Sequence, residues 1–347
     1  MTAVQIGSAL ETRSIYAVRI AVIGAGALGS TFACLLAEQG HDLVVTSRGA
    51  ALPVVRADGI RLSGGYGDRL ARPLVVERLV APCDLALICT KAQDAAAAIA
   101  ENAAVLDGTP VIGVQNGLDG VTTARRLLPQ SECFGLITII AAHYEGPGRV
   151  RVTTAAPSYL GRGDGPVDAA TLRWQAVLDA AVPTLALDNF VGAQWTKLVV
   201  NMLNALPAIT GLSVQEVIGQ AGLRRLMTRS MRETVRVGLA TPVRFGSLQG
   251  LSHRRLRAFA VAPLWAGQVL PLSMRSRMGT VPNQGSTLQS LGRGQRTEID
   301  FLNGAVAKAA AAIGVAAPVN ALLTELVHEV ERSGEFLQPD DVLARFA

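Results

Sequence analysis

The first half of the chain alternates short, wholly apolar runs with alanine-rich stretches of helical character. Such runs lack the in-and-out pattern of a half-exposed strand, and a parallel sheet covered on both faces requires them. Five of them are bounded by Gly, Pro or Asp: Val18–Ile23, Asp42–Thr46, Asp84–Cys89, Pro110–Val114 and Phe134–Ile140. The alternation predicts a doubly wound α/β region. More antiparallel strands are expected at Arg149–Thr154 and Ser158–Gly161, and a further strand at Thr184–Leu187.

Strand-like runs end near Asp188, and helical periodicity dominates the rest of the chain. Helices are expected at Gln194–Ala205, Leu223–Leu239, Glu298–Gly314 and Ala321–Ser333. We therefore predict a domain of residues 17–188 with a doubly wound sheet and an all-helical domain of residues 189–347. The stretch Thr241–Gly285 has six arginines and no acidic residue. It can be a solvated helical insertion, a lid or a subunit contact.

Composition excludes several classes of protein. Half of the 347 residues are hydrophobic, which rules out a mainly disordered chain. No run approaches the roughly 18 consecutive apolar residues of a membrane span, and the first 20 residues lack the pattern of a secretion signal. We therefore expect a soluble cytoplasmic protein. Four cysteines and four histidines show no C-x-x-C or H-x-x-x-H spacing, so neither a disulfide framework nor a metal site is expected.

The charge balance favours an anionic ligand. The formal net charge is +5, whereas aromatic residues make up only 4% of the chain and no nucleic-acid-binding signature is present. We therefore expect a small anionic molecule as the partner, and neither a nucleic acid nor a membrane.

A glycine motif follows the first predicted strand and opens a helix. Gly24 permits a tight turn, Gly26 lets the backbone approach a pyrophosphate, and Gly29 lets the helix pack closely on the strand. This G-x-G-x-x-G pattern in a strand–turn–helix context predicts a Rossmann-type dinucleotide site. The expected cofactor contacts here are Gly24, Ala25, Gly26, Ala27, Leu28 and Gly29.

The end of the second predicted strand discriminates between cofactors. Enzymes that use NAD carry an acidic residue about 20 positions after the glycines, where it receives the ribose hydroxyls. Here the strand is followed by Ser47 and Arg48 instead. A guanidinium can bind a 2′-phosphate that an acid would repel, so NADP(H) is favoured over NAD(H). A solvated surface arginine is the alternative interpretation of Arg48.

These features, together with several distant motifs, resemble the ketopantoate reductase (2-dehydropantoate 2-reductase) family from about Arg19 to Arg332. The motifs are Gly24–Gly29, Thr90–Ala92, Gln115–Gly117, Trp195–Asn201, Ser286–Gln289 and Gly292–Gly304. The resemblance implies NADPH-dependent reduction of 2-dehydropantoate to (R)-pantoate in pantothenate biosynthesis. It also implies an active site between a Rossmann-type domain and a helical domain.

Lys197, Asn201 and Asn204 are spaced to share one face of a single helix. A cation and two amides in an apolar helix are costly to bury without partners, so this row is expected to face a substrate. Structural hydrogen bonding is the alternative. The resemblance implies that Lys197 gives the proton to the ketone oxygen, and burial is expected to bring its pKa toward neutrality.

The remaining predicted site residues come from other segments. The resemblance implies that Asn116 contacts both nicotinamide and substrate, although Asn-Gly is also an ordinary turn signal. Lys91 follows a predicted strand, where its charge can hold the cofactor or the substrate, and a solvated lysine is the alternative. Ala141 is expected on the cofactor side, and the resemblance implies that Ser286 binds the substrate carboxylate. The resemblance implies that Glu298 accepts a hydrogen bond from the substrate hydroxyl or the nicotinamide ribose. Local sequence offers another account of it, in which Glu298 opens a helix capped by Thr297 with Asp300 three residues on.

Two departures from the family pattern lie on the substrate side. Ser290 stands where the family often has an acid, and Asn204 lies one residue before the usual second asparagine. The alternative functions are therefore a reductase of another 2-oxo acid or an opine-type substrate, and a catalytically silent NADP(H)-binding module. A homodimer is compatible with the apolar helical domain.

Overall fold

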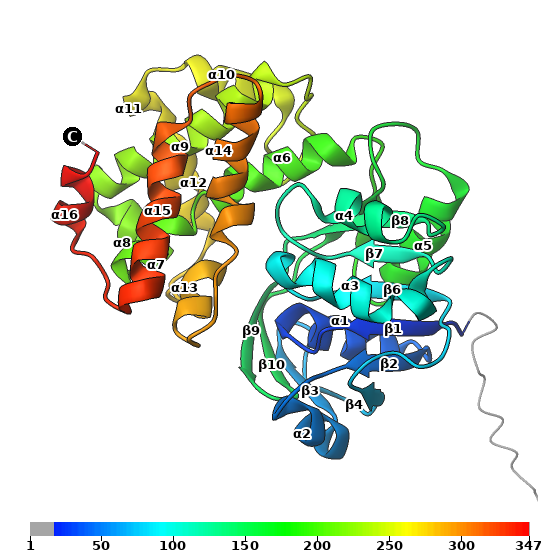
Figure 1. Ribbon diagram of the computed structural model, residues 1–347. Helices are drawn as coiled ribbons and strands as arrows, with labels where there is room; N and C mark the ends of the chain where they lie inside the picture. Colours follow the sequence, from blue (N-terminus) through cyan, green and yellow to red (C-terminus); the bar gives the residue numbers. More distant parts are fainter. Residues whose placement is uncertain (1–16, 347) are drawn as a thin grey trace, which may run out of the picture.

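The computed structural model describes residues 17–346, which form a sheet region and a helical region connected by helix α6 (Phe190–Asn201) (Figure 1). The predicted absence of a secretion signal concerns mainly residues 1–16, which lie outside the described residues. The predicted fold class, an α/β sheet domain followed by a helical domain, is confirmed.

Eight strands form the main sheet, in the order β12-β11-β8-β7-β6-β1-β2-β5. The six from β8 to β5 are parallel, whereas β11 runs antiparallel to β8 and parallel to β12. Their bounds are β1 Arg19–Ile23, β2 Asp42–Thr46, β5 Leu74–Val76, β6 Leu85–Ile88, β7 Val111–Gly113, β8 Cys133–Thr138, β11 Ser158–Gly161 and β12 Thr184–Ala186. All five runs predicted as buried strands are strands of this sheet.

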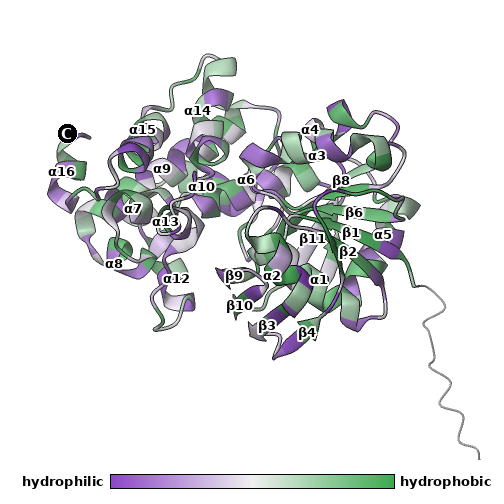
Figure 2. Cartoon of the chain, turned by 60° about the horizontal axis from the view of Figure 1, so that its bottom comes forward, coloured by the Kyte–Doolittle hydropathy of each residue, from purple (hydrophilic) through white to green (hydrophobic). Residues whose placement is uncertain are grey.

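Helices cover both faces of the main sheet, which explains why its strands are apolar throughout. On β1, Ile20 and Val22 belong to the core beneath α1 and α5, whereas Ala21 and Ile23 belong to the core beneath α3 and α4. All four residues are at most 1% exposed. Figure 2 shows β1, β2 and β6 as hydrophobic ribbons inside the sheet region. The helices of the sheet region are α1 Ala27–Glu38, α2 Ala51–Asp58, α3 Ala92–Leu106, α4 Gly120–Leu127 and α5 Ala169–Asp179.

A second, four-stranded sheet was not predicted from the sequence. Its order is β4-β3-β10-β9, with bounds β3 Ile60–Gly64, β4 Arg69–Ala71, β9 Ala141–Gly146 and β10 Arg149–Thr154. The predicted strands on either side of Pro157 therefore do not pair with each other. The first, β10, pairs with β3 and β9, and the second, β11, joins the main sheet.

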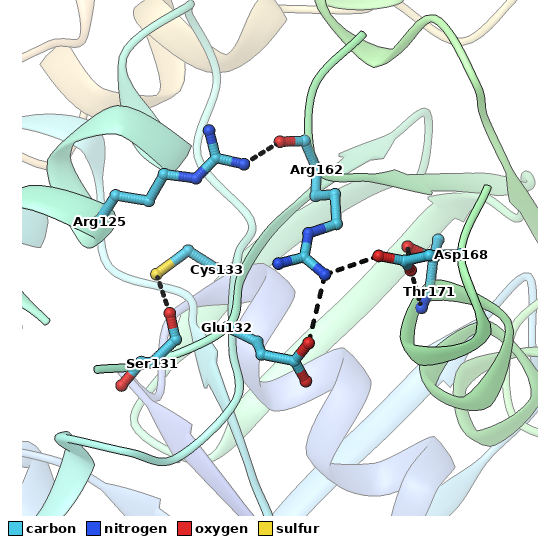
Figure 3. Close-up of polar contacts among 7 residues, drawn as sticks. All are labelled: Arg125, Ser131, Glu132, Cys133, Arg162, Asp168 and Thr171. Atoms are coloured by element: carbon cyan, nitrogen blue, oxygen red, sulfur yellow. Dashed lines mark hydrogen bonds and ion pairs between the residues drawn. The ribbon is translucent and has the colours of Figure 1, made fainter. Parts of the chain in front are cut away.

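Arg162, which follows β11, connects the antiparallel end of the main sheet to α5 through polar contacts (Figure 3). Arg162 Nη1 lies 2.7 Å from Asp168 Oδ2 and 3.2 Å from Glu132 Oε1, while its carbonyl oxygen accepts a hydrogen bond from Arg125. Asp168 also caps α5, because its Oδ1 accepts hydrogen bonds from the backbone N and the hydroxyl of Thr171. These hydrogen bonds lower the pKa of Asp168.

The helical region is built around α9 (Ala221–Ala240), which contacts most of the other helices. The hydrophobic core of the helical region consists of buried side chains from segments between Trp195 and Val342. The remaining helices are α7 Ala205–Thr210, α8 Val214–Gly219, α10 His253–Val261, α11 Leu264–Gly267, α12 Val269–Arg277, α13 Gly285–Leu291, the 3₁₀ turn η1 Ile299–Phe301, α14 Asn303–Ala312, α15 Pro318–Ser333 and α16 Pro339–Ala344. Among the described residues no helix is both long and apolar enough to cross a bilayer.

Two predicted helices are interrupted. The helix expected over Gln194–Ala205 ends at Asn201, and α7 begins at Ala205, so Asn204 does not lie on α6. The helix expected from Glu298 begins only at Asn303, after η1 and an irregular Leu302. The reason is tertiary, because Glu298 and Asp300 are held by side chains and backbone from other elements, as described below.

Candidate active site

A cavity of about 1670 Å³ lies between the two regions. Its walls combine the residues that follow β1, β2, β6 and β7 with residues of α6, α13 and the segment before η1. Carboxyl ends of parallel strands are where open α/β sheets place their ligands. The predicted site residues that line it are Gly24, Ala25, Gly26, Ala27, Leu28, Ser47, Arg48, Lys91, Asn116, Ala141, Lys197, Asn201, Asn204, Ser286 and Glu298.

The glycine turn has the properties expected of a dinucleotide loop. Gly24 has a φ of +105°, and a Cβ on it would lie 3.0 Å from Thr90, so the loop needs glycine there. A Cβ on Gly26 would meet no atom of the described residues within 4 Å, which leaves open space above the N-terminus of α1. Gly29 is buried and does not line the cavity. A Cβ on it would overlap the carbonyl oxygen of Gly24, so its role is close packing of helix against turn.

At the end of β2, the two predicted phosphate contacts differ in environment. Ser47 is 6% exposed, and its backbone N donates to the carbonyl oxygen of Val76. Arg48 is about half exposed and forms an ion pair with Glu101 of α3. A 2′-phosphate would therefore have to compete with Glu101 for this guanidinium or share it.

Glu298 contacts the sheet region directly. Its Oε1 accepts a hydrogen bond from the backbone N of Ala92 at 3.0 Å, and its Oε2 lies 3.4 Å from Asn116 Nδ2. The carboxylate thus lies at the N-terminus of α3, where the helix dipole favours an anion. The helix-opening account of Glu298 is correct only in that Glu298 precedes the 3₁₀ turn η1, because no α-helix begins there before Asn303. Thr297 Oγ1 accepts from the backbone N of Ile299, and Asp300 pairs with His328 rather than closing a capping box.

Lys91 also links the two regions. Its Nζ donates to the carbonyl oxygen of Arg296 at 2.8 Å and to Ser290 Oγ at 3.0 Å. Burial lowers the pKa of Lys91, with Glu298 opposing that shift and Arg293 adding to it. Ser290, which stands where the family often has an acid, is therefore a partner of Lys91 across the cavity.

Lys197 lies on α6 with its side chain lining the cavity. Burial lowers its pKa to about 8, as expected for an ammonium in an apolar setting. One turn further on, Asn201 is 6% exposed, and its buried Nδ2 has no hydrogen-bond acceptor among residues 17–346. A buried amide hydrogen without an acceptor is costly, and an oxygen of a bound ligand would satisfy it.

The prediction that Asn204 shares a helix face with Lys197 is wrong, because α6 ends before it. Asn204 instead lies at the N-terminus of α7, where its Oδ1 leaves no space for a side chain on Gly285 (a Cβ there would lie 2.6 Å away). Gly285 begins α13, and Ser286 is its next residue. Asn204 and Ser286 therefore reach the same cavity through the packing of α7 on α13.

Several cavity residues were not predicted as site residues. Arg293 and Arg296 line the cavity, as do Ser290 and Tyr144 of β9. Arg293 and Arg296 belong to the Gly292–Gly304 segment that carried the family resemblance. Their position as basic residues between the glycines of this segment is the sequence feature that could have predicted them as site residues. Tyr144 comes from the unpredicted small sheet, and no local pattern pointed to it.

The Thr241–Gly285 stretch is not merely a solvated insertion. Its helices α10, α11 and α12 pack on α9, and residues of all three line the cavity. Several of its apolar residues are nevertheless well exposed to solvent, including Val261, Trp265 and Val269.

The cavity is electropositive and suited to anions. Its lining cations outnumber its lining acids: Arg48, Lys91, Lys197, Arg255, Arg277, Arg293 and Arg296 against Asp94 and Glu298. Together with the open space at Gly26, this lining fits a phosphate-bearing dinucleotide and a carboxylate. The described residues contain no group of histidines, cysteines and carboxylates arranged to hold a metal ion.

Known proteins match the chain over most of its length. The family models "Ketopantoate reductase PanE/ApbA" and "Ketopantoate reductase PanE/ApbA C terminal" match residues 20–165 and 189–331. A 2-dehydropantoate 2-reductase of Halobacterium salinarum is 30% identical over 328 residues, covering 91% of this chain and 100% of that protein.

Solved structures agree with this match. The PanE/ApbA family ketopantoate reductase of Ralstonia eutropha JMP134 aligns with a TM-score of 0.75 and 28% identity, covering 90% of this chain and 98% of its own. D-mandelate dehydrogenase with NADH and anilino(oxo)acetate aligns with a TM-score of 0.78 over 91% of this chain and 99% of its own. At 22% identity, the latter likeness shows a shared fold only.

Proposed function

The chain belongs to the ketopantoate reductase family of oxidoreductases, and we propose that it reduces 2-dehydropantoate to (R)-pantoate with NADPH in pantothenate biosynthesis. The observation that carries this proposal is Lys197, a cavity-lining ammonium whose pKa is lowered to about 8, one helical turn from the unsatisfied amide of Asn201.

The cofactor would lie along the sheet side of the cavity. The backbone of Gly24–Leu28 at the N-terminus of α1 would hold the pyrophosphate, with Ser47 and Arg48 at the 2′-phosphate. Lys91, Asn116 and Ala141 would contact the nicotinamide half. When bound, NADPH supplies the hydride.

Lys197 would donate the proton to the carbonyl oxygen of the substrate. With a pKa of about 8, its ammonium is mostly protonated at neutral pH and yet gives up its proton more readily than a solvated lysine. The same positive charge would stabilise the negative charge that develops on this oxygen. Burial of Lys197 in the cavity strengthens that interaction.

Polar residues around Lys197 would orient the substrate. Asn201 offers an amide hydrogen without an acceptor, and Asn204 and Ser286 line the same cavity. Glu298 is held by Ala92 and Asn116, so it would fix the Asn116 amide and present its remaining lone pairs to the substrate hydroxyl. Glu298 would thereby couple the position of the two regions to substrate binding.

The test is to measure NADPH oxidation in the presence of 2-dehydropantoate, monitored as the decrease of the near-ultraviolet absorbance of NADPH. We expect turnover by the native chain, and strongly reduced turnover by Lys197→Ala. Lys308→Ala is the matched control, because Lys308 is a mostly exposed lysine on α14 outside the cavity. Tight NADPH binding without reduction of any 2-oxo acid would overturn the proposal and support the silent binding module.

Three further expectations accompany this proposal. We propose that the domains divide between residues 188 and 189, that the enzyme works in the cytoplasm and that it forms a homodimer. Sedimentation of the purified chain tests the last of these.

A further inference from the structure

The turn between Leu248 and Leu251 has a strained backbone. These two residues exchange backbone hydrogen bonds of 2.9 and 2.8 Å, and between them φ is +50° at Gln249 and +81° at Gly250. Positive φ at both central positions is typical of a type I′ turn, which favours glycine and asparagine. Within residues 17–346, Gln249 is the only residue other than glycine with a positive φ. The turn therefore keeps a long side chain at this position at a cost in stability.

Two arginines hold this turn in place. Arg277 of α12 donates from Nη1 to the carbonyl oxygen of Gln249 at 3.4 Å, and Arg255 of α10 donates to that of Gly250. A strained residue persists only where its surroundings determine its conformation, and these two contacts help to do so. Both arginines line the cavity, as do Gln249 and Gly250. The turn is thus a fixed part of the cavity wall.

Contacts with α6 place the turn near Lys197. Thr196, the residue before Lys197, donates from its hydroxyl to the carbonyl oxygen of Gly246 at 2.7 Å. A Cβ on Gly246 would lie 2.7 Å from the backbone N of Ala193, so this loop packs directly against α6. Gln249 is three residues further on, and its backbone therefore lies within about 11 Å of Gly246. Gln249 and Lys197 both line the cavity, so one small ligand can contact both side chains.

The chemistry of this part of the wall suits an anion. The side chain of Gln249 is exposed on the cavity wall and offers two N–H donors. The guanidiniums that bind the backbone of the turn make its surroundings positive, and Thr241–Gly285 contains no acid. The two acids of the cavity lining, Asp94 and Glu298, lie at the N-terminal end of α3 instead. An N–H donor in positive surroundings favours a carboxylate over a neutral group.

We propose that Gln249 is a further substrate-binding residue, whose amide donates to the carboxylate of the 2-oxo acid and is oriented for this contact by the strained turn. This proposal rests on the proposed reductase function. Gln249 approaches the carboxylate from the turn, and Ser286 approaches it from α13. Because every 2-oxo acid carries this carboxylate, Gln249 increases the affinity for the whole class and does not select among side chains.

The experiment compares the stability and the kinetics of Gln249→Gly with those of the native chain. Glycine relieves the backbone and removes the amide, so the midpoint of thermal unfolding should rise by about 2 °C. At saturating NADPH, KM for 2-dehydropantoate should rise about tenfold while kcat changes less than about twofold. The reason is that a contact made equally in the ground state and the transition state affects KM alone.

Two further variants are the controls. Gln249→Glu keeps the size of the side chain but replaces the N–H donors with a negative charge, so KM should rise more than in Gln249→Gly. Gln39→Gly is the matched control, because Gln39 is exposed at the end of α1, lies outside the cavity and has an ordinary φ of −82°. The same change there should leave KM unaltered and should not raise the unfolding midpoint.

A second substrate identifies the group that Gln249 binds. The acid 3,3-dimethyl-2-oxobutanoate has the carboxylate and the carbonyl of 2-dehydropantoate but lacks its distal hydroxyl. Gln249→Gly should therefore raise KM by the same factor for both acids. A rise confined to 2-dehydropantoate overturns the carboxylate assignment, because it indicates a contact with the hydroxyl.

The remaining outcomes distinguish this proposal from the one on which it rests. Turnover by the native chain with an unaltered KM in both Gln249 variants overturns the role of Gln249 and leaves the reductase intact. A lower unfolding midpoint in Gln249→Gly, or an equal rise of KM in Gln39→Gly, also overturns it. No reduction of any 2-oxo acid by the native chain overturns both proposals.

Discussion

The two walls of the cavity are built in different ways. On the sheet side, the turn of Gly24–Gly29 joins β1 to α1 within one continuous segment, and its shape depends on glycine and backbone. On the helical side, Lys197 lies on α6, far in the sequence from Ser286 of α13 and from Glu298 just before η1. One added methyl group can therefore distort the wall on the sheet side. The wall on the helical side depends instead on functional side chains that tertiary contacts position.

The largest expected effect separates chemistry from cofactor binding. Lys197→Ala should lower kcat/KM for 2-dehydropantoate by more than about a hundredfold, because a general acid contributes about 10²–10⁴-fold. The affinity for NADPH, measured by fluorescence titration, should change little. A variant that loses cofactor binding and turnover together would contradict the assignment of Lys197 to the substrate wall.

Next in size is the contrast between two glycines of the same turn. Gly29→Ala should unfold at markedly lower denaturant than the native chain, because the added methyl overlaps the Gly24 carbonyl, and overpacking costs about 1–3 kcal/mol or more. Gly26→Ala meets nothing within 4 Å and should unfold normally while binding NADPH weakly. Equal stability of the two variants would contradict this division of roles.

The pH dependence of the reaction tests the substrate wall without a mutation. The acid must be protonated, and burial puts the pKa of Lys197 at about 8. The rate of reduction should therefore be level below that pH and fall about tenfold per unit above it. A profile of kcat/KM at saturating NADPH checks this. If Lys197→Ala kept the same alkaline limb, another group would be responsible.

Cofactor preference should respond to Arg48. Arg48→Gln should weaken NADPH binding about tenfold, the scale of one charge-assisted hydrogen bond, with little effect on NADH. Glu101→Gln is the companion variant, because it removes the ion-pair partner of Arg48 and leaves the guanidinium for the phosphate. An unchanged ratio of NADPH to NADH affinity in Arg48→Gln would contradict the NADP(H) proposal.

The smallest effect concerns the support of Glu298. Burial opposes protonation of His328, but the hydrogen bonds of His328 with Glu331 and Asp300 outweigh burial and raise the pKa of His328. Glu331 also accepts a hydrogen bond from the backbone N of Thr297, the residue before Glu298. A group whose pKa is higher in the folded state than in the unfolded state stabilises the fold while it is protonated, at a pH below its pKa in the unfolded state. This contribution is lost as the pH rises through its pKa in the folded state. His328→Gln should therefore destabilise the protein at pH 5.5 more than at pH 8.5, by under about 1 kcal/mol in urea unfolding. A larger destabilisation at pH 8.5 than at pH 5.5 would contradict this assignment of His328.

The accuracy of the sequence-based predictions follows the same division. Seven of the eight strands of the main sheet were predicted closely, because apolar runs bounded by turn residues indicate burial on both faces. The edge strand β5 was missed, because it has only three residues and is partly exposed. The small sheet was missed because β4 and β9 are short or partly exposed and have no such pattern. Asn204 was placed on the wrong element because the helical spacing continues past Asn201, while α6 does not.

The sequence by itself determined the fold class and the dinucleotide turn, because both depend on local periodicity and on glycines that few other residues can replace. Tertiary structure alone decided that Glu298 meets Ala92 and Asn116, that Ser290 partners Lys91, and that the Thr241–Gly285 stretch lines the cavity. The physical reason is that hydrogen bonds and apolar contacts between distant segments form only once both cores have packed, and no local pattern encodes their pairing.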